Sequence, residues 1–386
     1  MKANESLPNY DSKVRESTNF IIKSIKTVCK DTPERRAGTE EEKQAQEYVK
    51  STMEKFADEI KVQDAAVKYP RISALVSSGI FAIIAIVFAC IAGFIPAITR
   101  YLLISAVICL SVSIFLCTSK KKISVQNTVC IKKPSAQAKR RIVFIGNIDS
   151  PVERRLLRIS GTKLESIAVT GFWCAIILCS LYDLFYAFFS DGAVPFINLV
   201  ELIFVPFIIL TMLLYNEKSV VNGATGNLTG NFDTLAVMQY LSYNNLSLEN
   251  TELVSVSVSA GAYGAKAFVS EYSKEFSDIP TVYVSVDCLQ SDKCFNYTVV
   301  NTENQLIEKA AENAGVEIFA GKDNLSSSLI SGMKGVKAIR ISAADEKDKF
   351  VYAAREDVIT EISPMAIEAG LKLSLETAYL FDEKGI

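Results

Sequence analysis

The segment RIVFIGNIDS, residues 141–150, decides the fold of the water-soluble part of this chain. Its first half is a short apolar run, 141–145, of the kind that forms a buried β-strand. Asn147, Asp149 and Ser150 follow at once, so the apolar run leads straight into a polar motif. The pattern predicts an interior strand that ends among polar side chains.

Helical and strand patterns alternate on both sides of this segment, as they should in an α/β domain. Thr39 and Glu42 have the spacing of a capping box before a helical run. No single soluble stretch holds enough strands to close a core, so residues 1–70, 120–164 and 217–386 are expected to form one domain together. The expected helices are 19–29, 45–56, 233–242, 265–276, 304–314 and 364–380, and the expected strands are 59–63, 128–132, 141–145, 253–258, 281–286, 316–319 and 337–342.

The composition excludes several classes of function. The chain of 386 residues contains no histidine, which removes Ser-His-Asp and Cys-His catalysis and imidazole metal ligands. A formal net charge of −2 provides no field that would attract nucleic acid, so we expect no nucleic-acid partner. Nine cysteines without a paired framework favour a reducing compartment.

Long apolar stretches predict four transmembrane helices, in keeping with a hydrophobic content of 49%. Each stretch is long enough to cross a hydrocarbon core about 30 Å thick, which takes about 20 helical residues. The stretches pair into two hairpins inserted in the soluble domain. The expected spans are residues 72–99 and 101–119 in the hairpin 72–119, and residues 166–190 and 192–216 in the hairpin 166–216.

Basic residues beside the spans predict the orientation in the membrane. All of them but Arg100 lie on the side that carries the soluble segments. Because positive charge is retained on the cytoplasmic face, we expect a multi-pass integral membrane protein, embedded in the lipid bilayer, with its soluble domain and both termini in the cytoplasm. The residues on that side are Lys68, Arg71, Lys120, Lys121, Lys122, Arg154, Arg155, Arg158, Lys163 and Lys218.

Two acids, Asp183 and Glu201, interrupt the second hairpin at similar depth. Carboxylates inside a membrane are costly, and they suggest a proton or cation site. The alternative is that both reach the far interface or share a proton. No lysine or arginine within the spans could neutralise them.

Six motifs follow one another along the soluble segments: RRAGT at 35–39, GNIDS at 146–150, NGATGNLTG at 222–230, VSAGAYGA at 258–265, Asp287 after a strand, and YAARED at 352–357. In this order they resemble the zinc-dependent exopeptidase family that includes bacterial leucyl aminopeptidase and aminopeptidase Y. The family versions are R-x-A-G-S/T, G-H-x-D-S, P-G-A-x-D-N-x-S-G, E-E-x-G-x-x-G-S, a metal-binding Asp and Y-H-T-x-x-D. The resemblance covers essentially every soluble segment. It implies a three-layer αβα aminopeptidase-like domain with a mixed central sheet, joined here to the four transmembrane helices.

The same resemblance implies that the groups of a di-zinc site are largely missing. The family binds two zinc ions through two His, a bridging Asp, a Glu and another Asp. Only Asp287 remains a good ligand, and Val258 stands where the general-base Glu would be and cannot accept a proton. Asp149, which would orient the first His, is left with nothing to orient. We expect no metal and no other cofactor, with zinc only if this interpretation is wrong. The residues at the five ligand positions are Asn147, Gly226, Ser259, Asp287 and Ala353.

These observations favour a membrane-anchored, catalytically inactive peptidase homologue that acts as a binding or scaffold module. Its ligand would be a peptide, protein or small molecule in a relic cleft that includes Asn227 and Gly261. One alternative is a membrane-bound metallo-aminopeptidase with an atypical site, and another is a Ser-Lys hydrolase that uses Ser259. A third is transport or sensing through Asp183 and Glu201.

Overall fold

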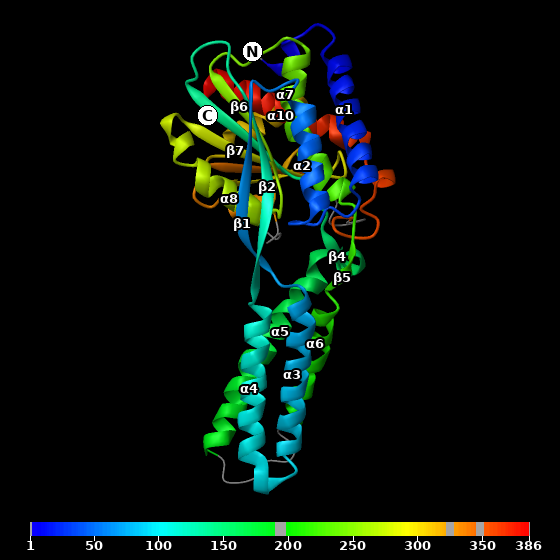
Figure 1. Ribbon diagram of the computed structural model, residues 1–386, viewed down its shortest axis with the longest axis vertical. Coiled ribbons are helices and arrows are strands. Elements are labelled where there is room, and N and C mark those ends of the chain that lie inside the picture. The colour runs from blue at the N-terminus through cyan, green and yellow to red at the C-terminus, as the bar shows by residue number, and fades with distance from the viewer. Residues whose placement is uncertain (1, 190–197, 322–327, 345–350, 386) are drawn as a thin grey trace. The chain divides into compact units, whose positions relative to one another are not determined.

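The computed structural model describes residues 2–189, 198–321, 328–344 and 351–385. The chain forms two compact units. The sheet unit comprises Met1–Lys68, Lys122–Val152 and Val220–Ile386, and the helical unit comprises Tyr69–Lys121 and Glu153–Ser219. Figure 1 shows that each unit is built from segments far apart in the sequence.

The sheet unit contains an eight-stranded mixed sheet in the order β1-β2-β6-β3-β7-β10-β8-β9. Its centre is parallel, because β3 lies parallel to β6 and β7, and β10 lies parallel to β7. Strands β2 and β8 run antiparallel to their neighbours β6 and β10. The strands are β1 Glu59–Pro70, β2 Lys120–Lys132, β3 Arg140–Asn147, β6 Thr251–Val258, β7 Thr281–Leu289, β8 Asn296–Val300, β9 Phe319–Ala320 and β10 Ala338–Ala343.

Strand β3 is buried on both faces, as the run at 141–145 predicts. Successive side chains of a strand point to opposite faces. Ile142 and Phe144 therefore pack into one apolar cluster, and Val143 and Ile145 pack into another. The first cluster contains residues of α1, α2, α7, α9 and α10, and the second contains residues of α8, so helices cover both faces of the sheet. The helices are α1 Tyr10–Asp31, α2 Glu40–Met53, α7 Thr229–Tyr243, α8 Ala262–Tyr272, α9 Gln305–Ala314 and α10 Pro364–Lys384.

Several element boundaries differ from the sequence-based expectations. The expected strand 316–319 is wrong over most of its length, because the Val316 N–H bonds to the Ala311 carbonyl (3.0 Å) and completes the end of α9. The helix expected at 265–276 stops at Tyr272, and a separate 3-10 turn, Glu275–Asp278, follows it. Strand β8 was not expected at all, and α1 begins at Tyr10 rather than at residue 19.

The helical unit contains the apolar helices α3 Ser73–Ala92, α4 Thr99–Cys117, α5 Leu157–Phe189 and α6 Val205–Met212, the last preceded by a 3-10 helix, Asn198–Phe204. Within the described residues, three helical segments are long and apolar enough to cross a membrane: Ser73–Ala92, Pro96–Cys117 and Lys163–Phe189. The fourth apolar segment, Leu199–Met212, is shorter. The start of the fourth predicted span and the turn at 191–192 lie outside the described residues. The expected end of that span at residue 216 is wrong, because strand β5, Tyr215–Val220, has already begun at that position.

Small and polar residues join the first two helices of this unit. The Ser78 hydroxyl donates to the Ser113 carbonyl, and the Ser113 hydroxyl donates to the Ser78 carbonyl, each at 2.9 Å. Such reciprocal bonds between small residues allow close approach of helices in an apolar medium. Ala82 and Ala85 of α3 and Ala106 of α4 are likewise fully buried at this contact.

Candidate functional site

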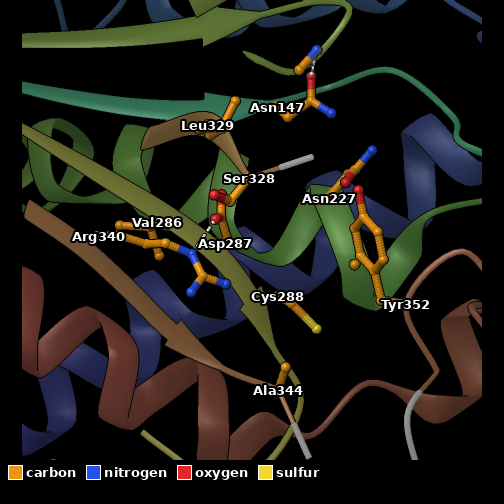
Figure 2. Close-up of a pocket in the computed structure, with 12 residues that line it drawn as sticks. Asn147, Asn227, Val286, Asp287, Cys288, Ser328, Leu329, Arg340, Ala344 and Tyr352 are labelled. Carbon is orange, nitrogen blue, oxygen red and sulfur yellow. Dashed lines mark hydrogen bonds and ion pairs between the residues drawn. The ribbon is translucent and has the colours of Figure 1, made fainter. Parts of the chain in front are cut away.

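A small pocket opens where the polar ends of the central strands meet (Figure 2). Parallel strands bring their carboxyl ends to one edge of a sheet, where ligands bind in open α/β folds. The pocket leaves about 30 Å³ for the centres of water molecules, which is room for about two waters. Five residues singled out from the sequence line it together: Asn147, Gly226, Asn227, Gly261 and Asp287.

The remaining predicted site residues lie behind the pocket wall. Ser259, Ala353 and Val258 are fully buried, and Asp149 is buried beside Asn147. Three polar lining residues were not anticipated, Cys288, Ser328 and Arg340, and a fourth, Tyr352, comes from the motif YAARED. The structure thus brings the predicted positions to one place and adds side chains that belong to other strands and loops.

Asp287, the one aligned residue that could bind zinc well, is engaged in an ion pair. The Arg340 Nε atom on β10 donates to Asp287 Oδ2 at 2.7 Å, as Figure 2 shows. The Arg340 side chain is 5% exposed and that of Asp287 is 14% exposed. In so little water the attraction is barely screened, so the carboxylate is held by the guanidinium group.

Other side chains fill the space beside Gly226, the residue that the resemblance places where the exopeptidases have a bridging carboxylate. A Cβ atom on Gly226 would lie 2.6 Å from Asp357 Oδ2 and 2.6 Å from a ring carbon of Tyr352. Asp357 is itself fully buried and accepts from the N–H groups of Thr225 (2.7 Å), Gly226 (3.0 Å) and Ala353 (3.2 Å). Burial raises the pKa of Asp357 to about 6, although the three N–H groups oppose that rise. The glycine is therefore needed for packing.

Asn147 and Asp149 hold the turn between β6 and α8. Asn147 Oδ1 accepts from the Gly261 N–H (3.2 Å), and Asp149 Oδ1 accepts from the Ala260 N–H (3.1 Å). Both turn residues have positive φ, 64° at Ala260 and 53° at Gly261, a conformation that fixed hydrogen bonds help to maintain. The expectation that Asp149 has nothing to orient is wrong, because it orients this turn. Burial raises the pKa of Asp149.

Ser259 belongs to a closed network that ties α2 to the sheet. Its hydroxyl donates to Glu42 Oε1 (2.5 Å) and accepts from Gln46 Nε2 (3.1 Å). Glu42 also accepts from the N–H groups of Gly38 (3.3 Å) and Gln126 (3.4 Å). A serine with no exposed surface and a carboxylate partner is not the lysine-activated nucleophile of a Ser-Lys hydrolase.

Glu42 was expected only as part of a helix cap. Thr39 does cap α2, since its side chain accepts from the Glu42 N–H at 3.4 Å. The Glu42 carboxylate, however, reaches Gly38 and the sheet rather than Thr39. Burial raises the pKa of Glu42 to about 7.

The residues at the pocket do not fit the di-zinc centre that the fold implies. Within the described part of the chain, no three Cys, Asp or Glu side chains are grouped so that they could hold a metal ion. Asp287 is paired with Arg340, and Asp357 is surrounded by backbone N–H groups rather than by other ligands. Zinc needs about four N, O or S donors around one point, and this arrangement offers no such set.

In the helical unit, Asp183 of α5 and Glu201 of the 3-10 helix Asn198–Phe204 are 0% and 4% exposed. They are close enough to repel each other when both are ionised. None of their four carboxylate oxygens has a hydrogen-bond partner among the described residues. The sequence predicted that the two acids lie at similar depth, and the structure brings them together.

The sheet, its helices and the pocket define an aminopeptidase-like α/β fold, and comparisons with known proteins agree. A glutaminyl cyclase from an Acidobacteriales bacterium superposes with a TM-score of 0.56 at 11% identity over 96% of each chain. A zinc aminopeptidase from Bacillus subtilis gives 0.56 at 14% identity over 95% of each chain. A leucine aminopeptidase precursor from Bacteroides thetaiotaomicron gives 0.53 at 10% identity over 94% of this chain and 96% of that one. No protein-family model and no curated protein matches the sequence.

At these identities the likeness establishes a shared fold. The expected mixed α/β domain is therefore confirmed, as is its likeness to zinc exopeptidases. The residues at the pocket must carry any statement about chemistry.

Proposed function

We propose that this chain is a membrane-anchored, non-catalytic relative of the zinc exopeptidases that acts as a binding or scaffold module. The observation that carries the proposal is the ion pair between Asp287 and Arg340, with 2.7 Å between Oδ2 and Nε. A metal ion approaching Asp287 would meet a fixed positive charge that has already neutralised this carboxylate. The side chains that fill the space at Gly226 support the same conclusion.

Peptide hydrolysis in this fold requires a metal-bound water and a base that takes its proton. Zinc binding worth about 10–16 kcal/mol is spread over about four donors, and one already paired acid supplies little of it. Val258, at the position of the base, is an aliphatic side chain buried in an apolar cluster. In this proposal the pocket keeps the shape of an active site and binds a peptide, a protein or a small molecule without cleaving it.

The membrane anchoring rests on the three apolar helical segments Ser73–Ala92, Pro96–Cys117 and Lys163–Phe189. With the basic residues that flank them, they support a multi-pass protein in the lipid bilayer whose soluble domain and termini face the cytoplasm. A near-neutral net charge of −2 gives no reason to add a nucleic-acid partner.

An aminopeptidase assay of the full chain in detergent, with zinc added, tests the proposal. We expect no turnover of aminoacyl p-nitroanilides above that of an Asp287→Ala variant. Zinc-dependent turnover that Asp287→Ala abolishes would instead establish a metallo-aminopeptidase with an atypical site. Far-ultraviolet circular dichroism of both proteins controls for folding.

A second function, transport or sensing of protons or cations, is favoured by one observation. Asp183 and Glu201 place two buried carboxyl groups beside each other inside the helical unit. Two adjacent carboxylates are costly in an apolar medium, and a proton or a cation between them would offset that cost.

Proteoliposomes that contain a pH-sensitive dye test this second function. We expect the wild-type chain to dissipate a pH gradient faster than the double variant Asp183→Asn with Glu201→Gln. The matched control is Cys174→Ser, an exposed position on the same helix. Equal rates in all three proteins would remove transport of protons from consideration.

A further inference from the structure

Arg340 has hydrogen-bond donors that no other described residue uses. Its Nε atom donates to Asp287, and the side chain makes no other hydrogen bond among the described residues. A guanidinium group has five N–H donors, of which four belong to the two terminal nitrogens. Figure 2 shows this planar end of Arg340 at the pocket, between Asp287 and Cys288.

Donors at this position need an acceptor. The Arg340 side chain is only 5% exposed, and its terminal nitrogens are not among the buried atoms without a partner, so the little surface they keep opens to the pocket. A charged donor with so little access to water gains from an acceptor placed beside it. An anion or ordered waters in the pocket would satisfy them.

The size of the pocket favours a carboxylate. The space for about two water centres, about 30 Å³, matches two oxygen atoms side by side. A carboxylate presents two such oxygens in one plane, and it accepts two parallel bonds from the guanidinium fork. A space of this size leaves little room for a tetrahedral group such as phosphate.

The charge of the pocket points the same way. Asp287 is the only acid and Arg340 the only base among the residues known to line it, so the pair is neutral as a whole. A singly charged ligand on the far side of the guanidinium group is attracted to it and is only partly repelled by Asp287. A doubly charged phosphate would have both the attraction to Arg340 and the repulsion from Asp287 doubled, so the preference for a carboxylate over phosphate rests on the size of the pocket.

We propose that Arg340 binds the carboxylate of a small acid or of a peptide C terminus in this pocket. The inference rests on the proposed function, because it gives the relic cleft a ligand class. Asp287 then has a second role: it holds the guanidinium plane in place through Nε and moderates the affinity for anions.

Isothermal titration of the full chain in detergent, in a carboxylate-free buffer, tests the inference with four probes. Acetate represents a small acid and N-acetylglycine represents a peptide C terminus, while N-acetylglycinamide and inorganic phosphate serve as controls. We expect saturable binding of acetate, of N-acetylglycine or of both, and at least about tenfold weaker binding of the amide and of phosphate. Whichever carboxylate binds more tightly identifies the source.

Two variants should move the affinity in opposite directions. Arg340→Gln removes the fork and should weaken binding of the preferred carboxylate by at least about tenfold. Asp287→Asn removes the nearby negative charge and should strengthen it several-fold. Arg340→Lys keeps the charge without the fork and should lie between wild type and Arg340→Gln.

The matched control is Arg141→Gln, since Arg141 is also a buried arginine of the sheet, paired with Glu252 and Asp278 outside the pocket. Its carboxylate affinity should equal that of wild type. Four results would overturn the inference. They are equal affinity for N-acetylglycine and its amide, unchanged carboxylate affinity in Arg340→Gln, tighter binding of phosphate than of either carboxylate, and no binding of any probe. None of these results bears on the aminopeptidase assay, whose outcome alone decides the proposed function.

Discussion

The carboxyl group of Glu42 should make the sheet unit less stable as the pH rises. Burial raises its pKa from 4.5 to about 7 in the folded protein. A group whose pKa is raised on folding stabilises the protein fully below its unfolded pKa, and that contribution is lost as the pH rises through the folded pKa. A rise in the pKa of Glu42 from 4.5 to about 7 corresponds to about 3 kcal/mol of unfolding free energy, at about 1.4 kcal/mol per pKa unit.

The variant Glu42→Gln removes this titration and keeps the shape of the side chain. An amide whose oxygen takes the Oε1 position still accepts from Ser259 Oγ and loses the weak bond from the Gly38 N–H, whereas the opposite orientation donates to Ser259 Oγ and loses the weak bond from the Gln126 N–H. We therefore expect the variant to be somewhat less stable than wild type at pH 5. Between pH 5 and pH 8 its stability relative to wild type should rise by up to about 3 kcal/mol.

Pulse proteolysis in urea, with the full chain in detergent, measures this difference because it follows cleavage of the sheet unit directly. Asp233 and Asp357, whose pKa values burial raises to about 7 and about 6, titrate in both proteins and cancel in the comparison. Parallel stability curves for wild type and variant from pH 5 to pH 8 would refute the reasoning, since Glu42 would then be ionised in the folded protein at low pH.

Two further predictions concern packing. Gly226→Ala should destabilise the sheet unit by about 1–3 kcal/mol, because the new Cβ would lie 2.6 Å from Asp357 Oδ2. The control Gly335→Ala has no atom within 4 Å of its new Cβ, so its unfolding free energy should stay within about 0.5 kcal/mol of wild type in the same assay. Ser78→Ala should weaken the contact between α3 and α4 by about 0.6 kcal/mol, the average for such bonds in a membrane. Urea or dodecyl sulfate titration in mixed micelles, followed by Trp173 fluorescence, should show a loss of unfolding free energy no larger than that.

The sequence was informative where one element decides its own structure. The run 141–145 predicts an interior strand, because its four successive apolar residues, 142–145, would expose apolar side chains on both faces of a sheet if it faced water. Thr39 predicts the start of α2, because a helix leaves its first N–H groups without partners and a threonine side chain can accept from one of them. Elements of this kind account for the alternating order of strands and helices.

The pocket depends on partners that are distant in the sequence, and these were not predictable one at a time. The ion pair of Asp287 joins β7 to β10, and Asp357 reaches a turn more than a hundred positions earlier in the chain. One signal could have identified Arg340, because a charged residue inside the apolar strand AIRISA is buried only with a partner. Strand β8 was missed because it contains polar residues and is held mainly by its antiparallel neighbour β10.

Metal content tests the central claim most directly. The full chain is dialysed against a buffer with micromolar zinc, then against metal-free buffer, and its zinc is counted by inductively coupled plasma mass spectrometry. Asp287 is held in an ion pair with Arg340, and no group of three possible ligand side chains occurs among the described residues. We therefore predict far less than one bound zinc ion per chain. One or two zinc ions retained per chain, and lost in Asp287→Asn, would contradict the account.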